Sequence, residues 1–147
     1  MRKTSSPRSG RILAVVDTGP LYAAVDADDD EHARSVEVLE RGELQLVIPA
    51  LVVAEATYLI GSRLGAGVEA RFLQSLVDFE VEAPEPEEWE RIGRLVEAYA
   101  DLPLGGTDAS LVTLAERLGT DVAITLDRRH LGAVRPRHVA ALQLLPE

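Results

Sequence analysis

Two largely apolar, β-branched runs stand out near the two ends of the chain. They cover residues 12–16 (ILAVV) and 122–126 (VAITL), and an aspartate, Asp17 or Asp127, follows each run directly. Such continuous runs are typical of strands that are buried on both faces of a parallel sheet. Shorter runs predict three further strands, at residues 46–48, 79–81 and 141–145.

Between these runs, apolar residues recur at helical spacing in segments bounded by glycine or proline. The predicted helices cover residues 19–25, a segment from the acidic stretch 26–31 to about 41, and residues 51–64, 68–77, 87–99 and 108–118. Residues 105–107 are expected to form a loop, and an Arg-rich turn is expected after Asp127. Short strands that alternate with helices predict an α/β sandwich with a largely parallel sheet.

A length of 147 residues suits a single domain with its own hydrophobic core. Residues 1–10 carry three basic charges and are expected to be a flexible tail or the product of an early start codon, which leaves 11–147 as the domain. The absence of cysteine excludes disulfides, thiolate zinc sites and thiol catalysis, and fits a reducing cytoplasm. No apolar run approaches the ~18 residues that span a bilayer, so no membrane segment is expected.

Four carboxylates lie on or beside the most hydrophobic segments: Asp17, Glu55, Asp108 and Asp127. Sites in open parallel sheets form beyond the carboxyl ends of the strands, which is where Asp17 and Asp127 are placed. Asp108 opens a predicted helix and Glu55 lies about one turn into another, so both can reach the same rim. We therefore expect the four acids to converge.

Convergence is unfavourable without a counter-charge, since two carboxylates ~5 Å apart repel by roughly 3 kcal/mol at an effective dielectric constant of 20. An all-oxygen site selects hard cations such as Mg²⁺ or Mn²⁺. Such a cation polarises a phosphoryl oxygen and lowers the pKa of a bound water. The pattern thus points to metal-assisted hydrolysis.

Each acid also has an ordinary structural interpretation. Asp108 could be a helix N-cap, Asp127 a turn residue or a surface ion pair, and Asp17 a cap at a strand-to-helix turn. Glu55 is different, because its apolar neighbours leave little room for a solvent-facing side, and we expect it to be the least exposed of the four.

The residues around these acids resemble those of PIN-domain ribonucleases, specifically the VapC toxins of type II toxin–antitoxin modules. The resemblance runs from about Ile12 to Pro146 and is carried by the segments VDTGPL at 16–21, PALVVAE at 49–55, TDAS at 107–110 and TLDRRH at 125–130. It implies a PIN-like three-layer α/β/α sandwich in which Asp17, Glu55, Asp108 and Asp127 match the acidic quartet.

The resemblance further implies an endoribonuclease dependent on Mg²⁺ or Mn²⁺ that acts on structured RNA, often tRNA or ribosomal RNA. It implies a homodimer and a small VapB-like antitoxin whose tail blocks the acidic site. Thr18 and Thr125 match hydroxyl positions that orient the site. Many relatives carry another acid where this chain has Gly105-Gly106; the nearest acid here is Asp101, so the number of metal ions stays open.

Charge restricts how such a protein could hold RNA. After the tail, 12 Arg and no Lys stand against 25 acids, a net charge of −13, which opposes binding through bulk electrostatics. Residues 128–138 are the exception, with four Arg, two His and no acid. Arg128 and Arg129 are therefore candidates for phosphate contacts, although surface ion pairs explain each equally well. The few aromatic residues show no stacking pattern, which favours recognition by shape and backbone.

Two other functions fit parts of the pattern. An Asp-nucleophile phosphatase or phosphotransfer domain also places an aspartate after its first strand. Against it, Gly19 replaces a second acid two residues after Asp17, and the domain lacks the lysine that usually pairs with phosphate. A non-catalytic interaction module of the same fold is the second alternative, and clustered acids without a use would only lower its stability.

Overall fold

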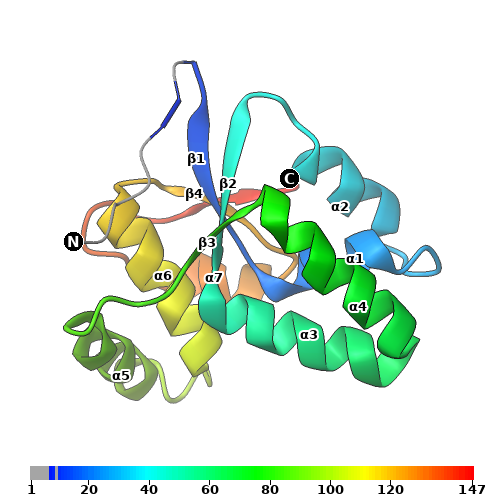
Figure 1. Cartoon of the computed structure of the whole chain (residues 1–147). Coiled ribbons are helices and arrows are strands. Elements are labelled where there is room, and N and C mark those ends of the chain that lie inside the picture. The colour runs from blue at the N-terminus through cyan, green and yellow to red at the C-terminus, as the bar shows by residue number, and fades with distance from the viewer. Residues whose placement is uncertain (1–6, 9) are drawn as a thin grey trace.

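The computed structural model describes residues 7, 8 and 10–147, and its centre is a five-stranded sheet in the order β3-β2-β1-β4-β5. Every pair of neighbouring strands is parallel, which confirms the expected sheet and extends the prediction from mainly to entirely parallel (Figure 1). The strands are β1 (Ile12–Val16), β2 (Leu44–Pro49), β3 (Glu80–Glu82), β4 (Val122–Ile124) and β5 (Gln143–Leu145).

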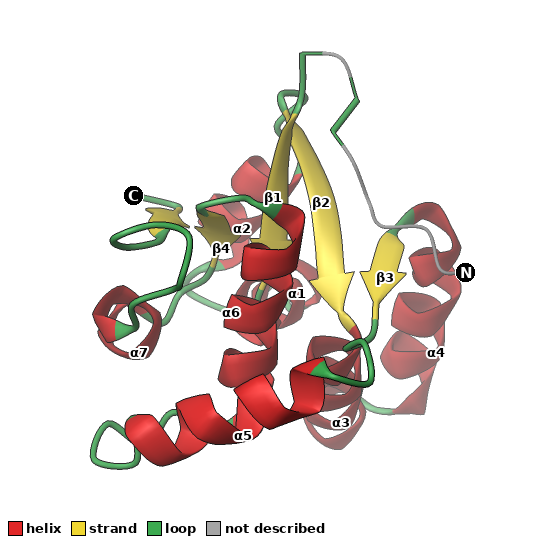
Figure 2. Cartoon of the chain, turned by 90° about the vertical axis from the view of Figure 1, so that its left-hand side faces the viewer, coloured by secondary structure: helices red, strands yellow, loops and turns green. Residues whose placement is uncertain are grey.

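Helices cover both faces of this sheet and give the three layers of an α/β/α sandwich (Figure 2). They are α1 (Thr18–Val25), α2 (His32–Leu39), α3 (Ala50–Leu64), α4 (Ala66–Ser75), the 3-10 helix η1 (Leu76–Asp78), α5 (Glu88–Ala98), α6 (Gly106–Leu118) and α7 (Arg128–Ala133). Side chains of β1 alternate between the layers: Leu13 and Val15 pack with α5, α6 and α7, whereas Ala14 and Val16 pack with α1 to α4. This double burial explains the continuous apolar run.

Three of the differences from the prediction lie near the carboxyl edge of the sheet and change the description of the site. Helix α6 begins at Gly106, so Gly106 and Thr107 belong to its first turn and only Gly105 remains outside as the N-cap. Strand β4 ends at Ile124, two residues earlier than expected, and the next residue, Thr125, donates its hydroxyl to Asp17. The expected Arg-rich turn is instead the short helix α7, capped by Asp127 and anchored by buried Leu131.

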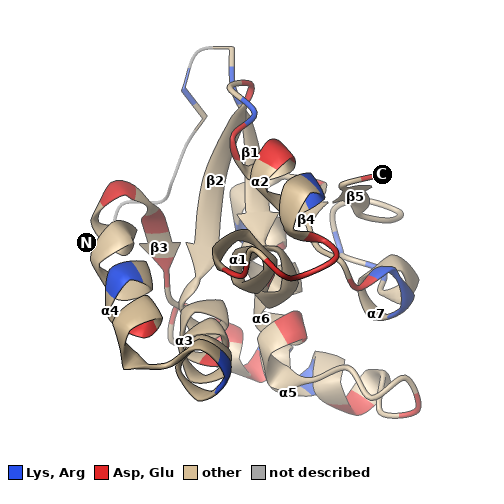
Figure 3. Cartoon of the chain, turned by 90° about the vertical axis from the view of Figure 1, so that its right-hand side faces the viewer, with Lys and Arg blue, Asp and Glu red and all other residues tan. Residues whose placement is uncertain are grey.

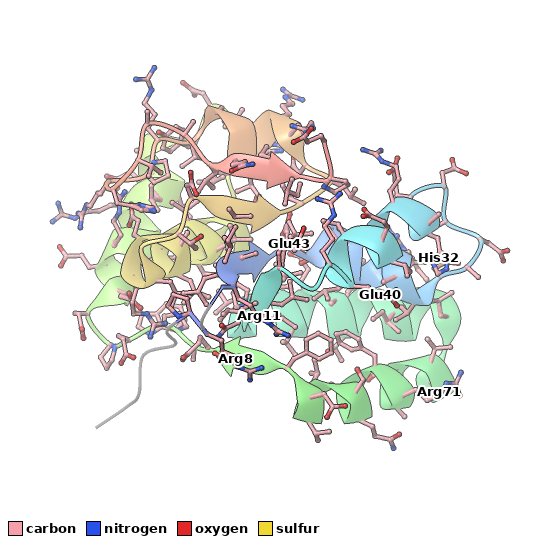
Figure 4. All side chains as sticks on the ribbon, turned by 90° about the horizontal axis from the view of Figure 1, so that it is seen from above. Arg8, Arg11, His32, Glu40, Glu43 and Arg71 are labelled. Atoms are coloured by element: carbon pink, nitrogen blue, oxygen red, sulfur yellow. The ribbon has the colours of Figure 1, made fainter. Side chains whose placement is uncertain are left out.

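The predicted tail falls mostly outside the described residues. Of its described part, the backbone N–H of Arg8 donates to the Gln45 side chain at 2.7 Å. Arg8 and Arg11 lie close together beside the start of β1 and line a separate cavity of ≈ 280 Å³ (Figure 4). In the described part of the chain, no helix has both the length and the apolar character required to cross a bilayer.

Candidate active site

The carboxyl ends of the central strands β1 and β4 meet at one cavity of ≈ 580 Å³. The two chain segments are tied together there, because the backbone N–H of Asp17 donates to the carbonyl oxygen of Ile124 at 2.9 Å. All four predicted acids line this cavity. Its described lining is Asp17, Thr18, Gly19, Glu55, Leu59, Gly105, Gly106, Thr107, Asp108, Leu126 and Asp127, and none of these is basic.

Asp17 is the buried centre of this cavity, with only 6% of its surface exposed. One carboxylate oxygen, Oδ1, accepts from the backbone N–H of Thr18 at 2.8 Å, which caps α1. The other, Oδ2, accepts from Thr125 Oγ1 at 2.7 Å, and Thr125 Oγ1 in turn accepts from the backbone N–H of Asp127 at 2.9 Å. A single buried hydroxyl thus fixes two of the four acids relative to each other.

Asp108 lies in the first turn of α6, two residues after the first helical residue, rather than at the N-cap. Its carboxylate accepts a hydrogen bond from the backbone N–H of the true N-cap, Gly105. An acid in this position satisfies a free N–H at the helix start and also interacts favourably with the helix dipole. The capping and functional interpretations are therefore compatible at this residue.

Asp127 is the N-cap of α7, and sequence reasoning missed its main partner. Oδ1 accepts from the backbone N–H of His130 at 3.0 Å, and Oδ2 lies 2.8 Å from the Nδ1 atom of the same histidine. His130 is three residues further along, the spacing at which an N-cap carboxylate meets the first turn of a helix. Had a helix been predicted after Asp127, this three-residue spacing would have indicated the contact with His130.

The expectation that Glu55 is the least exposed acid is wrong. Helix α3 buries the stripe Val52, Ala56 and Ile60 against the sheet, and Glu55 lies at the exposed flank of this stripe, where it lines the cavity. Apolar side chains also lie on that side, and Tyr58 is 74% exposed. Because apolar residues occur on both the buried and the exposed sides of α3, the sequence did not show which side faces the core. The buried acid is Asp17 and not Glu55.

The hydroxyl and arginine candidates have different surroundings. Thr18 lines the cavity, and its Oγ1 is buried without a hydrogen-bond partner among the described residues. Arg128 points its Nη2 toward the C-terminal segment, 3.0 Å from the carbonyl oxygen of Pro146. Arg129 is exposed on α7, and neither arginine lines the acidic cavity. Asp101, the nearest alternative for an additional acid, is exposed and also lies outside the lining.

Burial and mutual repulsion both act on the acids. Burial is the largest cause that raises the pKa of Asp17, and the charges of Glu55 and Asp127 raise it further against the hydrogen bonds from Thr125 and Thr18. Burial also raises the pKa of Asp108 to about 6, reinforced by the charges of Asp17, Asp127 and Glu55. These couplings show that the cavity concentrates uncompensated negative charge.

The donors present suit a hard divalent cation in number and chemistry. Across the described residues, no three Asp, Glu or His side chains lie close enough to hold a metal ion as they are placed. Four carboxylates nevertheless line one cavity beside the unpaired hydroxyl oxygen of Thr18, and oxygen donors of this kind favour Mg²⁺ or Mn²⁺. Closing around an ion requires side-chain rotation, for which exposed Glu55 has room.

The raised pKa of Asp108 predicts a stability that depends on pH in the metal-free protein. Between its ordinary pKa of 3.8 and its folded value of about 6, the folded protein binds more protons at this group than the unfolded chain. Stability is therefore expected to fall as the pH rises through this range. Asp108→Asn has no carboxylate at this position, so its stability should not fall over this range. Its free energy of unfolding at about pH 7.5 should therefore exceed that of the parent by roughly 1 kcal/mol, because solvent screening reduces the value that the pKa shift alone would give.

Urea unfolding in EDTA at about pH 7.5 and about pH 4 measures this effect, and the two proteins should differ little at the lower pH. Equal stability of both proteins at both pH values would contradict a raised pKa of Asp108. Asn keeps an oxygen that can accept from Gly105, so the cap is retained in the variant.

Comparisons with known proteins agree with this geometry. The family model described as PIN domain matches residues 14–135. Ribonuclease VapC26 of Mycobacterium tuberculosis is 37% identical over 124 residues, which cover 83% of this chain and 92% of that protein. The family match spans the positions of all four acids, and the relative is matched over nearly its full length.

Solved structures share the fold at lower identity. VapC20 of Mycobacterium tuberculosis, a toxin that cleaves the Sarcin-Ricin loop, superposes with a TM-score of 0.73 at 17% identity and covers 87% of this chain and 98% of its own. The structure of VapBC2 from Rickettsia felis, bound to a DNA fragment from its promoter, has a TM-score of 0.63 at 16% identity and covers 90% and 98%. At these identities the likeness concerns the fold.

Proposed function

Since the chain belongs to the PIN-domain family, we propose that it is a metal-dependent endoribonuclease and the toxin of a VapBC-type toxin–antitoxin module. One observation carries the proposal: four carboxylates from four separate elements line a single cavity at the carboxyl edge of the sheet. That cavity lies in a chain 37% identical to a protein named a ribonuclease.

We propose Mg²⁺ or Mn²⁺ as the cofactor, held by Asp17, Glu55, Asp108 and Asp127. When bound, such a cation neutralises charge on the phosphodiester and lowers the pKa of the attacking water. Thr125 keeps Asp17 and Asp127 in register through its two hydrogen bonds. The hydroxyl of Thr18, buried in the cavity wall without a partner among the described residues, is available to orient a phosphate oxygen or the water.

The substrate we propose is structured RNA, of the tRNA or ribosomal RNA class, recognised mainly through backbone and shape. Arg128 and Arg129 remain the proposed phosphate contacts beside Asp127. The neighbouring toxin VapC20, which acts on the Sarcin-Ricin loop, supports this substrate class through its shared fold.

The proposed partners are a VapB-like antitoxin, whose tail would block the acidic cavity, and a second copy of this chain in a homodimer. The VapBC2 structure is a toxin–antitoxin assembly built on the same fold, which supports the first of these. We propose a cytoplasmic location, where an RNA substrate would be found; a sequence without cysteine is compatible with that reducing compartment.

A circular RNA substrate tests the proposal directly, because only an endonuclease can open it. The purified protein, freed of any bound antitoxin, is expected to linearise the circle in Mg²⁺ or Mn²⁺ and to leave it closed in EDTA. Excess Mg²⁺ added after EDTA should restore cleavage. A circle that stays closed with both metals would favour the non-catalytic interaction module.

A further inference from the structure

A second, smaller cavity adjoins the acidic one on the far side of Leu126. Its volume is ≈ 190 Å³, and it contains two arginines, Arg34 from α2 and Arg128 from α7. Its described lining is Glu31, Arg34, Thr125, Leu126, Arg128 and Pro146. We call it the arginine groove. Leu126 lines both cavities, so they lie next to each other with this residue between them.

The arginine groove is the place next to the acidic cavity where positive charge collects. Arg34 pairs with Glu31 at 2.7 Å, which leaves the charge of Arg128 uncompensated within the lining. Figure 3 shows basic positions of both α2 and α7 in the right-hand half of that view. The other arginines of the 128–138 segment lie elsewhere, and the backbone of Arg137 is bonded to Glu116 at a different cavity.

Both guanidinium groups keep donors for a further ligand. The described hydrogen bonds of Arg34 go to the Glu31 side chain and to the backbone oxygen of Glu147, the last residue. Those of Arg128 go to the carbonyl oxygens of Leu144 and Pro146. An arginine has five N–H donors in a planar fork that matches phosphate, so three remain on each beside its two described hydrogen bonds. The existing contacts hold the forks in place, which lowers the entropic cost of binding.

Electrostatics favour an RNA strand as the occupant. The acidic cavity repels the phosphates on both sides of the bond it would cleave, and no described residue of its lining is basic. A strand entering it therefore needs a cationic contact at the nearest opening. We propose that the arginine groove binds a backbone phosphate of the RNA strand adjacent to the one in the acidic cavity, with Arg34 and Arg128 as its two donors.

This inference rests on the proposed ribonuclease function and adds a residue, Arg34, that no sequence motif indicated. Thr125 lies between the two cavities: it lines the groove, and its hydroxyl donates to Asp17. A phosphate in the groove would therefore be held at a fixed position relative to Asp17, because Thr125 contacts both. The groove acts as a positioning subsite, so its loss should raise KM and leave kcat at saturating RNA unchanged.

The test measures binding of a fluorescein-labelled single-stranded oligoribonucleotide by anisotropy, in an Asp17→Asn background that prevents cleavage. Arg34→Gln and Arg128→Gln are each expected to raise Kd about 5- to 10-fold at low salt and to reduce the slope of log K against log[salt] by about 0.7. Arg94→Gln is the matched control, because Arg94 is also an exposed helical arginine paired with a glutamate one turn away, Glu90, and it lies on α5. Arg34→Lys should retain the salt slope, since it keeps the charge.

Steady-state cleavage by the corresponding variants with Asp17 intact completes the test, with a raised KM and an unchanged kcat expected. If Arg34→Gln and Arg128→Gln bind and cleave like Arg94→Gln, the groove holds no phosphate. Should Arg128→Gln unfold because its C-terminal contacts are lost, Arg34→Gln decides alone. If the parent protein cleaves no RNA, the ribonuclease proposal fails, while the binding measurements still decide the groove.

Discussion

Asp17→Asn is expected to abolish RNA cleavage, with a loss of at least about 10³-fold, equivalent to roughly 4 kcal/mol of transition-state stabilisation. Asp17 is the most buried of the four acids and is oriented by two hydrogen bonds, from Thr18 and Thr125. Asn has nearly the same shape but no charge, so the site loses its central anion while the packing is kept.

Initial rates on labelled RNA and a thermal unfolding curve of each protein measure this effect. The variant should fold at least as stably as the parent in EDTA, because a buried charge with a raised pKa has been removed. Asp101→Asn is the matched control, since Asp101 is exposed and does not line the cavity, and its rate should equal that of the parent. An Asp17→Asn protein that cuts at the parental rate would show that the acids do not form the catalytic site.

Mn²⁺ is expected to raise the melting temperature of the parent protein by roughly 10 °C at about 100 times its Kd, because binding to the folded state alone adds about 2.7 kcal/mol. The bound cation compensates the burial and the repulsion that together raise the pKa of Asp108, and this contributes to its affinity. In Asp108→Asn one carboxylate ligand is missing, so the increase should be small.

Differential scanning fluorimetry over a series of Mn²⁺ concentrations gives this comparison, with EDTA reversing the shift in the parent. Asp101→Asn should respond like the parent, which separates loss of a specific ligand from loss of any acid. An equal rise in the parent and Asp108→Asn would mean that Mn²⁺ binds elsewhere. The melting temperatures of the parent and of Asp108→Asn in EDTA at neutral pH serve as the reference from which each shift is measured.

Local pattern was sufficient for most of the secondary structure and for the chemistry of the site. The runs at β1 and β4 are buried on both faces, so their apolar character was continuous, and an aspartate after each marked the carboxyl edge. Parallel topology then placed these ends together. The order of strands in the sheet was beyond the sequence, since it depends on which surfaces pack in three dimensions.

Two features of the site misled sequence reasoning for identifiable reasons. Helix α7 has only six residues and four of them are arginine, histidine or glycine, so it carries no apolar period; capping by Asp127 and the burial of Leu131 create it. Glu55 was assigned to the interior because α3 is rich in apolar residues on its exposed side as well. Arg34 has no local signal at all, because its place beside Leu126 arises from tertiary packing.

The hydrogen bond between Thr125 and Asp17 joins residues 108 positions apart, and it closes the seam between β1 and β4 at the middle of the sheet. During synthesis, a ribosome that has produced only the first half of the chain has made Asp17 and Glu55 but neither their partners nor the strand that seats them. The nuclease thus becomes competent only after the second half has emerged and inserted β4 beside β1.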